Sequence, residues 1–155
     1  MTLRLVDTDW GAELTDALRA YTSTLRIVSP VIKAGALERL LALKPKSVEV
    51  ITRFNLADFA EGVSDLKALH RVLKAGGRVR GIRNLHAKLY LFGASLAIVT
   101  SANLTGAALD RNAEFGAVLQ DAAGIATCGA YFDAPRQLTH AGGGLLQISR
   151  RRIAA

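Results

Sequence analysis

Short apolar runs alternate with amphipathic segments along most of the chain. The runs are rich in valine, isoleucine and leucine, and turn residues bound them, which is typical of buried β-strands. The predicted strands comprise residues 2–6, 24–30, 47–53, 78–83, 86–92, 96–101 and 113–120. Helical spacing of apolar residues predicts helices over residues 10–22, 34–43, 63–77 and 122–138.

Strands that alternate with helices predict an α/β protein built on a layered sheet. Asp9 is the expected N-cap of the first helix, and Ser64 is the expected N-cap of the third. The sequence shows no internal repeat and no linker long enough to divide it. We therefore expect one domain over residues 1–155, in which residues 141–155 form a loop and a basic tail.

The net charge of the chain indicates a kind of partner. The chain has 155 residues, a formal net charge of +7 and a pI near 10.1. This balance favours a polyanionic partner, most simply DNA or RNA. No apolar run is long enough to cross a bilayer, and the N-terminal residues lack the pattern of a secretory signal. We expect a cytoplasmic protein without stable membrane association, and the single Cys128 fits a reducing compartment.

Five polar residues cluster around three consecutive predicted strands. His86 and Lys88 are two apart in one strand, so their side chains are expected to share a face. Ser101 and Asn103 follow the end of the next strand, and Glu114 stands at the start of the one after. If the three strands are neighbours, all five side chains converge at one site, and ligand sites in α/β sheets usually lie at strand ends.

These groups suit the hydrolysis of a phosphodiester. A neutral imidazole can attack phosphorus and form a covalent intermediate. Lysine and asparagine can hold the non-bridging oxygens, and a carboxylate can fix the orientation of the imidazole. The other histidines and the cysteine show no metal-ligand spacing, so we expect neither a metal nor another cofactor.

The stretch around His86 resembles the phospholipase D superfamily, whose signature is H-x-K, four residues, D, six residues and G-S-x-N. His86 and Lys88 match H-x-K, Ser101 and Asn103 stand at the correct distance, and Glu114 matches a later N-x-E. The similarity extends over residues 25–119. It implies an α-β-α sandwich with a mixed central sheet, and a phosphodiesterase that works through a phosphohistidine. In that reading His86, Lys88, Asn103 and Glu114 are catalytic, and Ser101 binds substrate.

Two positions depart from the signature. Gly93 stands where the family has its aspartate, and Thr100 stands where the family has a glycine. The family's aspartate is less directly involved in bond breaking than the histidine, lysine and asparagine. The absence of the aspartate leaves open whether the chain is active.

Only one H-x-K occurs in the chain, whereas the family's active site uses two. One histidine attacks and the other protonates the leaving oxygen. A two-fold homodimer would supply the second copy, with one composite site near its axis. On this ground we expect a homodimer.

Other functions are compatible with the same residues. The chain could be a nucleic-acid-binding module of a larger restriction or helicase-type system, with weak catalysis or none. It could also be a phospholipid phosphodiesterase. Arg53 and Asp58 follow a predicted strand, where they either line the same cleft or form a structural salt bridge.

Overall fold

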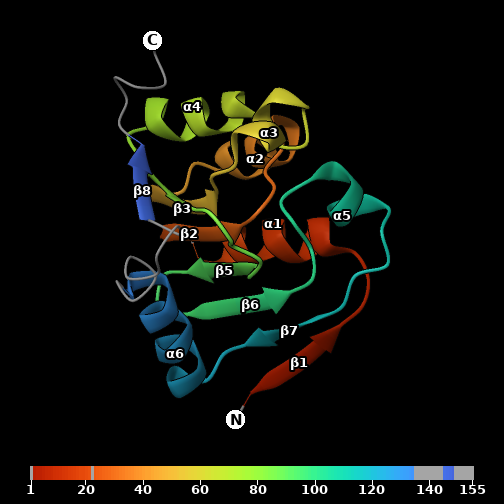
Figure 1. The fold of residues 1–155 in the computed structure, drawn as a ribbon. Coiled ribbons are helices and arrows are strands. Elements are labelled where there is room, and N and C mark those ends of the chain that lie inside the picture. Colours follow the sequence, from red (N-terminus) through yellow and green to blue (C-terminus); the bar gives the residue numbers. More distant parts are fainter. Residues whose placement is uncertain (1, 22, 135–144, 149–155) are drawn as a thin grey trace.

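A computed structural model describes residues 2–21, 23–134 and 145–148 of the chain. Its eight strands form a single sheet in the order β1-β7-β6-β5-β2-β3-β4-β8 (Figure 1). The strands are β1 (Leu3–Val6), β2 (Thr24–Ser29), β3 (Ser47–Arg53), β4 (Arg78–Ile82), β5 (Leu89–Phe92), β6 (Leu96–Thr100), β7 (Gly116–Leu119) and β8 (Leu145–Ile148). The helices are α1 (Trp10–Ala20), α2 (Ala34–Leu41), α3 (Leu56–Ala60), α4 (Leu66–Lys74), α5 (Gly106–Asp110) and α6 (Ala122–Asp133).

The sheet is mixed. Strands β2, β3 and β4 are parallel to one another, and every other pairing is antiparallel. β3, the next strand in the chain, pairs with β2 on one side, and β5 pairs with β2 on the other side. The two halves of the sheet therefore meet between β2 and β5, and the predicted neighbours β5, β6 and β7 are adjacent.

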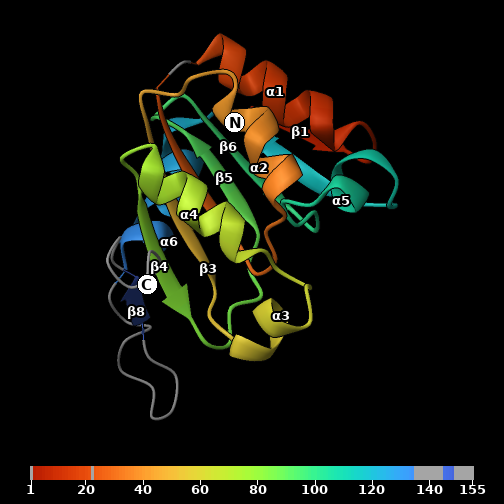
Figure 2. The same cartoon turned by 90° about the horizontal axis from the view of Figure 1, so that it is seen from above.

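Helices cover both faces of the sheet, which gives three layers. Helices α1, α2, α4 and α5 contribute to the larger apolar core on one face, and α6 packs over the smaller core on the other. Figure 2 shows α1, α2 and α4 across the near side of the sheet, with α6 behind it. The α-β-α sandwich with a mixed sheet agrees with the fold that the sequence predicts.

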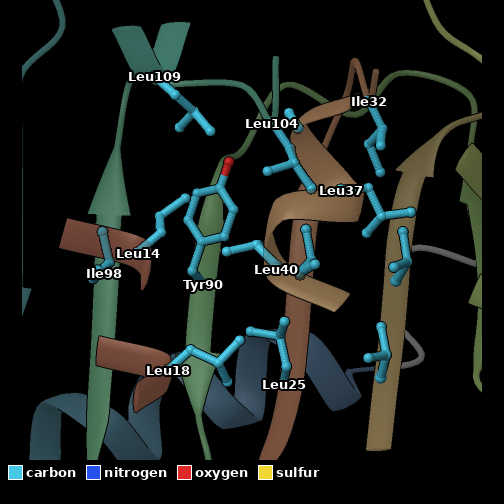
Figure 3. Packing of buried hydrophobic residues seen from close by; sticks show 14 of the residues in the cluster. Leu14, Leu18, Leu25, Ile32, Leu37, Leu40, Tyr90, Ile98, Leu104 and Leu109 are labelled. Atoms are coloured by element: carbon cyan, nitrogen blue, oxygen red, sulfur yellow. The ribbon is translucent and has the colours of Figure 1, made fainter. Parts of the chain in front are cut away.

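Tyr90 lies at the centre of the larger core. It is fully buried among leucines of α1, α2 and α5 and the neighbouring strands (Figure 3). Its hydroxyl donates a hydrogen bond to the Ala102 carbonyl at 3.0 Å, so this polar atom is satisfied without water. Burial raises the pKa of Tyr90, which keeps the phenol neutral. The bond ties β5 to the segment that follows β6, where two of the predicted site residues lie.

Of the two predicted helix caps, one is confirmed in its position and the other is wrong. Asp9 occupies the N-cap position of α1 but adopts a left-handed φ of 55° and makes no capping side-chain bond. Ser64 is buried, and its hydroxyl accepts a hydrogen bond from the Ile32 amide at 3.0 Å. Asp65 is the N-cap residue of α4, and its carboxylate binds Lys33 and the Ala34 amide. Ser64 and Asp65 thus bond to the segment after β2 instead of capping α4 through their side chains.

Some elements differ from those predicted. The short helices α3 and α5 were not predicted, because they are only five residues long and carry little apolar periodicity. Leu145–Ile148 forms β8, which pairs with β4, and so part of the predicted loop and tail is a strand. The predicted end of the last helix at residues 135–138, and residues 141–144 and 149–155 of the predicted tail, lie outside the described residues. Among the residues that the structure describes, no helix has the length and hydropathy needed to span a bilayer.

Candidate active site

All five predicted site residues lie at one edge of the sheet. His86 and Lys88 precede β5, Ser101 and Asn103 follow β6, and Glu114 precedes β7. Because β6 runs antiparallel to both neighbours, the start of β5, the end of β6 and the start of β7 meet at this edge. The parallel strands β2, β3 and β4 also end there, and this is the edge where α/β sheets usually bind ligands.

His86 and Lys88 lie in an irregular segment rather than in the predicted strand, since β5 begins at Leu89. The ladder between β2 and β5 stops there because Pro30, which follows β2, has no amide hydrogen to donate. The two side chains nevertheless face each other. Lys88 Nζ lies 3.4 Å from Nδ1 of His86 and donates to the His86 carbonyl at 2.9 Å. The imidazole is exposed, so Nε2 is the ring nitrogen left to face a substrate.

Asn103 is held by the end of β2. Its Oδ1 accepts a hydrogen bond from the Val31 amide at 3.3 Å and lies 3.4 Å from Oγ of the buried Ser29. The Ser29 hydroxyl in turn donates to the Val31 carbonyl at 2.7 Å and accepts from the Leu104 amide at 3.0 Å. With its oxygen occupied, the Asn103 side chain has its two Nδ2 hydrogens available for an anion.

Glu114 is fixed by its neighbours at the same edge. The Ser101 hydroxyl donates to one carboxylate oxygen, and Asn112 Nδ2 donates to the other at 3.4 Å. The Phe115 amide donates to Ser101 Oγ at 3.0 Å, so this hydroxyl is already engaged on both sides. Within the described residues Glu114 makes no hydrogen bond to His86. The roles predicted for Ser101 as a phosphate contact and for Glu114 as a support of the imidazole stay predictions.

The electrostatics of the edge centre on Lys88. Burial lowers the pKa of its ammonium, the charge of Glu114 opposes that effect, and the charge of Arg53 adds to it. The net result is a pKa below the ordinary lysine value. Arg53 therefore lies near enough to Lys88 to act on it, although Arg53 ends β3 and Lys88 precedes β5.

Arg53 and Asp58 form an ion pair, with 2.7 Å between Nε and Oδ2. Of the two arrangements that the sequence left open, the structure contains the salt bridge, and it lies at the edge of the sheet that carries His86. Ser29 is the site residue that sequence reasoning missed. A serine at the end of an apolar run carries no local signal, because the partners that define its role lie more than 70 residues away.

The edge of the sheet that carries the five predicted site residues is called the polar edge below. An apolar cavity of about 530 Å³ adjoins it. His86, Lys88 and Ser101 line one side of it, while Val99 of β6 and Cys128 of α6 belong to the rest of its wall. Burial and then the charge of Asp121 raise the pKa of the Cys128 thiol, so it is not activated as a nucleophile. No group of three His, Cys, Asp or Glu side chains that could hold a metal ion occurs in the described ranges.

The two departures from the signature have different positions. Gly93 lies in the turn after β5, at the opposite end of that strand from His86, and has a φ of +57°. Its replacement of the family's aspartate therefore removes no group from the polar edge. Thr100 is the last residue of β6, and its hydroxyl accepts from the Ala102 amide at 3.1 Å. That bond shapes the turn that leads to Asn103.

Solved structures with this fold come from several organisms. Nuc of Salmonella typhimurium, described as a phospholipase D family member, superposes with a TM-score of 0.70 at 16% identity, over 84% of this chain and 91% of its own. NucT from Helicobacter pylori superposes with a TM-score of 0.74 at 13% identity, over 95% of this chain and 99% of its own. TrmBL2, an archaeal chromatin protein that binds DNA, gives 0.58 at 11% identity, and this chain covers 51% of it.

Sequence comparison gives the family. No curated protein sequence matches the chain with significance. A family model described as "Cardiolipin synthase, PLD-like domain" matches residues 14–135, which include the whole polar edge. With that match, and with His86, Lys88 and Asn103 brought to one edge of the same fold, the chain belongs to the phospholipase D-like family.

Proposed function

We propose that the protein is a metal-independent phosphodiesterase that hydrolyses DNA or RNA through a phosphohistidine, in an active site shared by two chains of a homodimer. The observation that carries the proposal is the placement of Lys88 Nζ 3.4 Å from the His86 ring, at the edge that also holds Asn103. An exposed imidazole beside a cation and a free amide is the set of groups that attack on a phosphodiester requires.

The first step forms a covalent intermediate. Nε2 of one His86 attacks phosphorus, the bond from phosphorus to the leaving oxygen breaks, and that oxygen takes a proton from the partner subunit's His86. Lys88 and Asn103 hold the non-bridging oxygens, on which negative charge increases in the transition state. Glu114 supports the positive charge of the phosphorylated imidazole.

The second step restores the enzyme. A water molecule gives a proton to the partner subunit's His86, which is now neutral, and its oxygen attacks phosphorus. The bond from phosphorus to Nε2 breaks, which releases the phosphate monoester and leaves both histidines ready for another cycle. Each chain supplies one histidine, so a single chain carries only half of the site.

An exposed apolar surface beside the half-site supports the dimer. Leu3, Leu5, Val99 and Phe115 are 47%, 63%, 44% and 58% exposed. The two leucines lie on β1, Val99 lies on β6, and Phe115 immediately precedes β7, so the four occupy one end of the sheet. Val99 also lines the cavity beside His86, which makes this surface continuous with the polar edge. We assign it to a second copy of the chain.

Two observations favour a nucleic acid as the substrate. The net charge of +7 attracts a polyanion. TrmBL2, of which this chain covers 51%, is described as binding DNA. The family description names cardiolipin synthase, so a phospholipid is the competing substrate. The first experiment therefore includes both classes.

The test of the activity compares wild type with His86→Ala on plasmid DNA, single-stranded DNA, RNA and phosphatidylglycerol vesicles, all in excess EDTA. We expect wild type to cleave a nucleic acid and the variant to bind it without cleavage. Cleavage of the lipid alone would replace the substrate in the proposal. Binding by both proteins without cleavage by either would identify a binding module instead.

The test of the shared site uses Leu5→Asp, which places a charge on the exposed surface at β1, three strands away from β5. Analytical ultracentrifugation should show a dimer for wild type and a monomer for the variant, and cleavage should be lost with the dimer. Leu66→Asp is the matched control, because Leu66 is 51% exposed on α4, away from this surface. Full activity in monomeric Leu5→Asp would contradict the shared site.

A further inference from the structure

Arg53 is a charged residue at the polar edge that the proposed mechanism does not use. It is the last residue of β3, and its amide donates a hydrogen bond to the Pro30 carbonyl at 3.3 Å. The next residue after Pro30 is Val31, whose amide donates to Asn103 Oδ1. One short segment of backbone thus joins Arg53 to the amide that is expected to hold the phosphate.

The register of the sheet places Arg53 within reach of Lys88. Thr52 pairs with Ser29, and Val28 pairs with Leu89, so Arg53 and the start of β5 lie on either side of the end of β2. Two strand spacings amount to about 10 Å, which an arginine and a lysine side chain can bridge with a bound anion between them. The effect of Arg53 on the pKa of Lys88 agrees with this placement.

The Arg53 side chain is held in a way that leaves one side of it open. Nε donates to Asp58 Oδ2 at 2.7 Å, and the terminal nitrogens donate to no residue in the described part of the chain. The Asp58 side chain is only 14% exposed, and its carbonyl accepts a hydrogen bond from the Ser64 amide at 3.0 Å. A guanidinium fixed through Nε presents its two terminal nitrogens as a fork that fits a phosphate.

We propose that Arg53 is a substrate-binding residue that donates from its terminal nitrogens to a phosphate of the bound diester, and that Asp58 positions it. This inference rests on the proposed function and deepens it by a second cation in each half-site. Two neighbouring cations repel each other while the site is empty, and a phosphate between them removes the repulsion. The ion pair with Asp58 holds the guanidinium in place before the substrate arrives.

The test compares wild type with Arg53→Gln and Asp58→Asn. The control is Arg19→Gln, which removes the same charge from an exposed residue near the C-terminal end of α1. This helix leads into the start of β2, whereas the polar edge lies at the end of β2. Hydrolysis of bis(4-nitrophenyl) phosphate and of a single-stranded oligonucleotide is followed over a range of pH. Arg53→Gln should lower kcat/KM by about 10- to 100-fold, and Arg19→Gln should change it less than twofold. NMR titration should show a higher pKa for Lys88 in Arg53→Gln than in wild type, because a charge that lowers this pKa is gone.

Binding supplies a readout that does not depend on turnover. In a His86→Ala background, the slope of log K against log salt for the oligonucleotide should fall by about 0.7 when Arg53→Gln is added, since one phosphate contact is lost. Asp58→Asn should weaken binding less than Arg53→Gln does, and it should lower the salt slope by less. Circular dichroism checks the fold, and Arg53→Lys, which keeps the charge without the fork, serves if Arg53→Gln does not fold.

The outcomes separate the two proposals. An unchanged salt slope and unchanged kcat/KM in folded Arg53→Gln would overturn the role of Arg53. Wild-type rates in Arg53→Lys would overturn the two-nitrogen contact. If wild type cleaves neither substrate but the salt slope still falls in Arg53→Gln, the phosphate contact stands and the proposed catalysis fails.

Discussion

Ser29→Ala tests how the polar edge is held together. The Ser29 hydroxyl is fully buried at the end of β2, donates to the Val31 carbonyl at 2.7 Å and accepts from the Leu104 amide at 3.0 Å. Alanine removes both bonds. The buried Leu104 amide and the partly buried Val31 carbonyl then lose their partner, and Asn103 loses one of the two groups around its oxygen.

The expected destabilisation follows from these bonds. A buried group left unsatisfied costs about 1–3 kcal/mol, so Ser29→Ala should lower the free energy of unfolding by about 2–4 kcal/mol. A domain of this size typically has about 5–15 kcal/mol in total, and Tm should fall by about 5–15 °C. Where the variant is still folded, its turnover should also fall, because the amide of Asn103 is less well fixed.

Urea unfolding measures the effect directly. Trp10 is the only tryptophan of the chain and is 2% exposed, so its fluorescence reports the loss of the larger core. Ser95→Ala in the exposed turn after β5 is the matched control and should change the free energy by less than about 0.5 kcal/mol. A Ser29→Ala variant as stable as that control would refute the role given to this hydroxyl.

Two further substitutions test the site and the departure from the signature. Gly93→Asp should destabilise the fold by about 1–2 kcal/mol without raising activity, because the residue has a φ of +57° and a Cβ there would lie 2.5 Å from Ser23 Oγ. Thermal unfolding measures the stability and cleavage measures the activity. A gain of activity would contradict the prediction. Burial should leave the pKa of Lys88 below the ordinary lysine range, which NMR titration of the folded protein measures. Glu114→Gln should lower that pKa further, because a charge that raises it is gone; a pKa that rises in the variant would contradict this.

Most of the sheet could be predicted because its strands are short apolar runs bounded by turn residues. The ends of the strands at the polar edge could not be predicted. The strand predicted over residues 86–92 begins only at Leu89 because Pro30 interrupts the ladder across the sheet. The strand predicted over residues 113–120 begins only at Gly116, where a Cβ would lie 2.4 Å from the Val99 carbonyl. Neither effect is visible in the segment that it changes, because each depends on a neighbouring strand.

The residues of the candidate site could be predicted from the sequence, but the hydrogen bonds that join them could not. The spacing of His86, Lys88 and Asn103 identified the groups, and the structure brings them to one edge. That Ser101 holds Glu114, and that Ser29 lies against Asn103, depends on contacts between segments far apart in the chain. Side-chain chemistry could be inferred from the order of residues, whereas the hydrogen-bond partners required the three-dimensional fold.

Helix α6 forms one wall of the cavity beside His86, and its attachment has a consequence for local motion. Only Ile125 and Phe132 of this helix are buried, and the guanidinium carbons of Arg26 and Arg80 lie 5.3 and 4.8 Å from the centre of the Phe132 ring. Local opening is easiest where few apolar contacts hold an element. Amide hydrogen exchange should therefore be faster in α6 than in β2 or β5. This wall can open while the opposite layer and the polar edge stay folded.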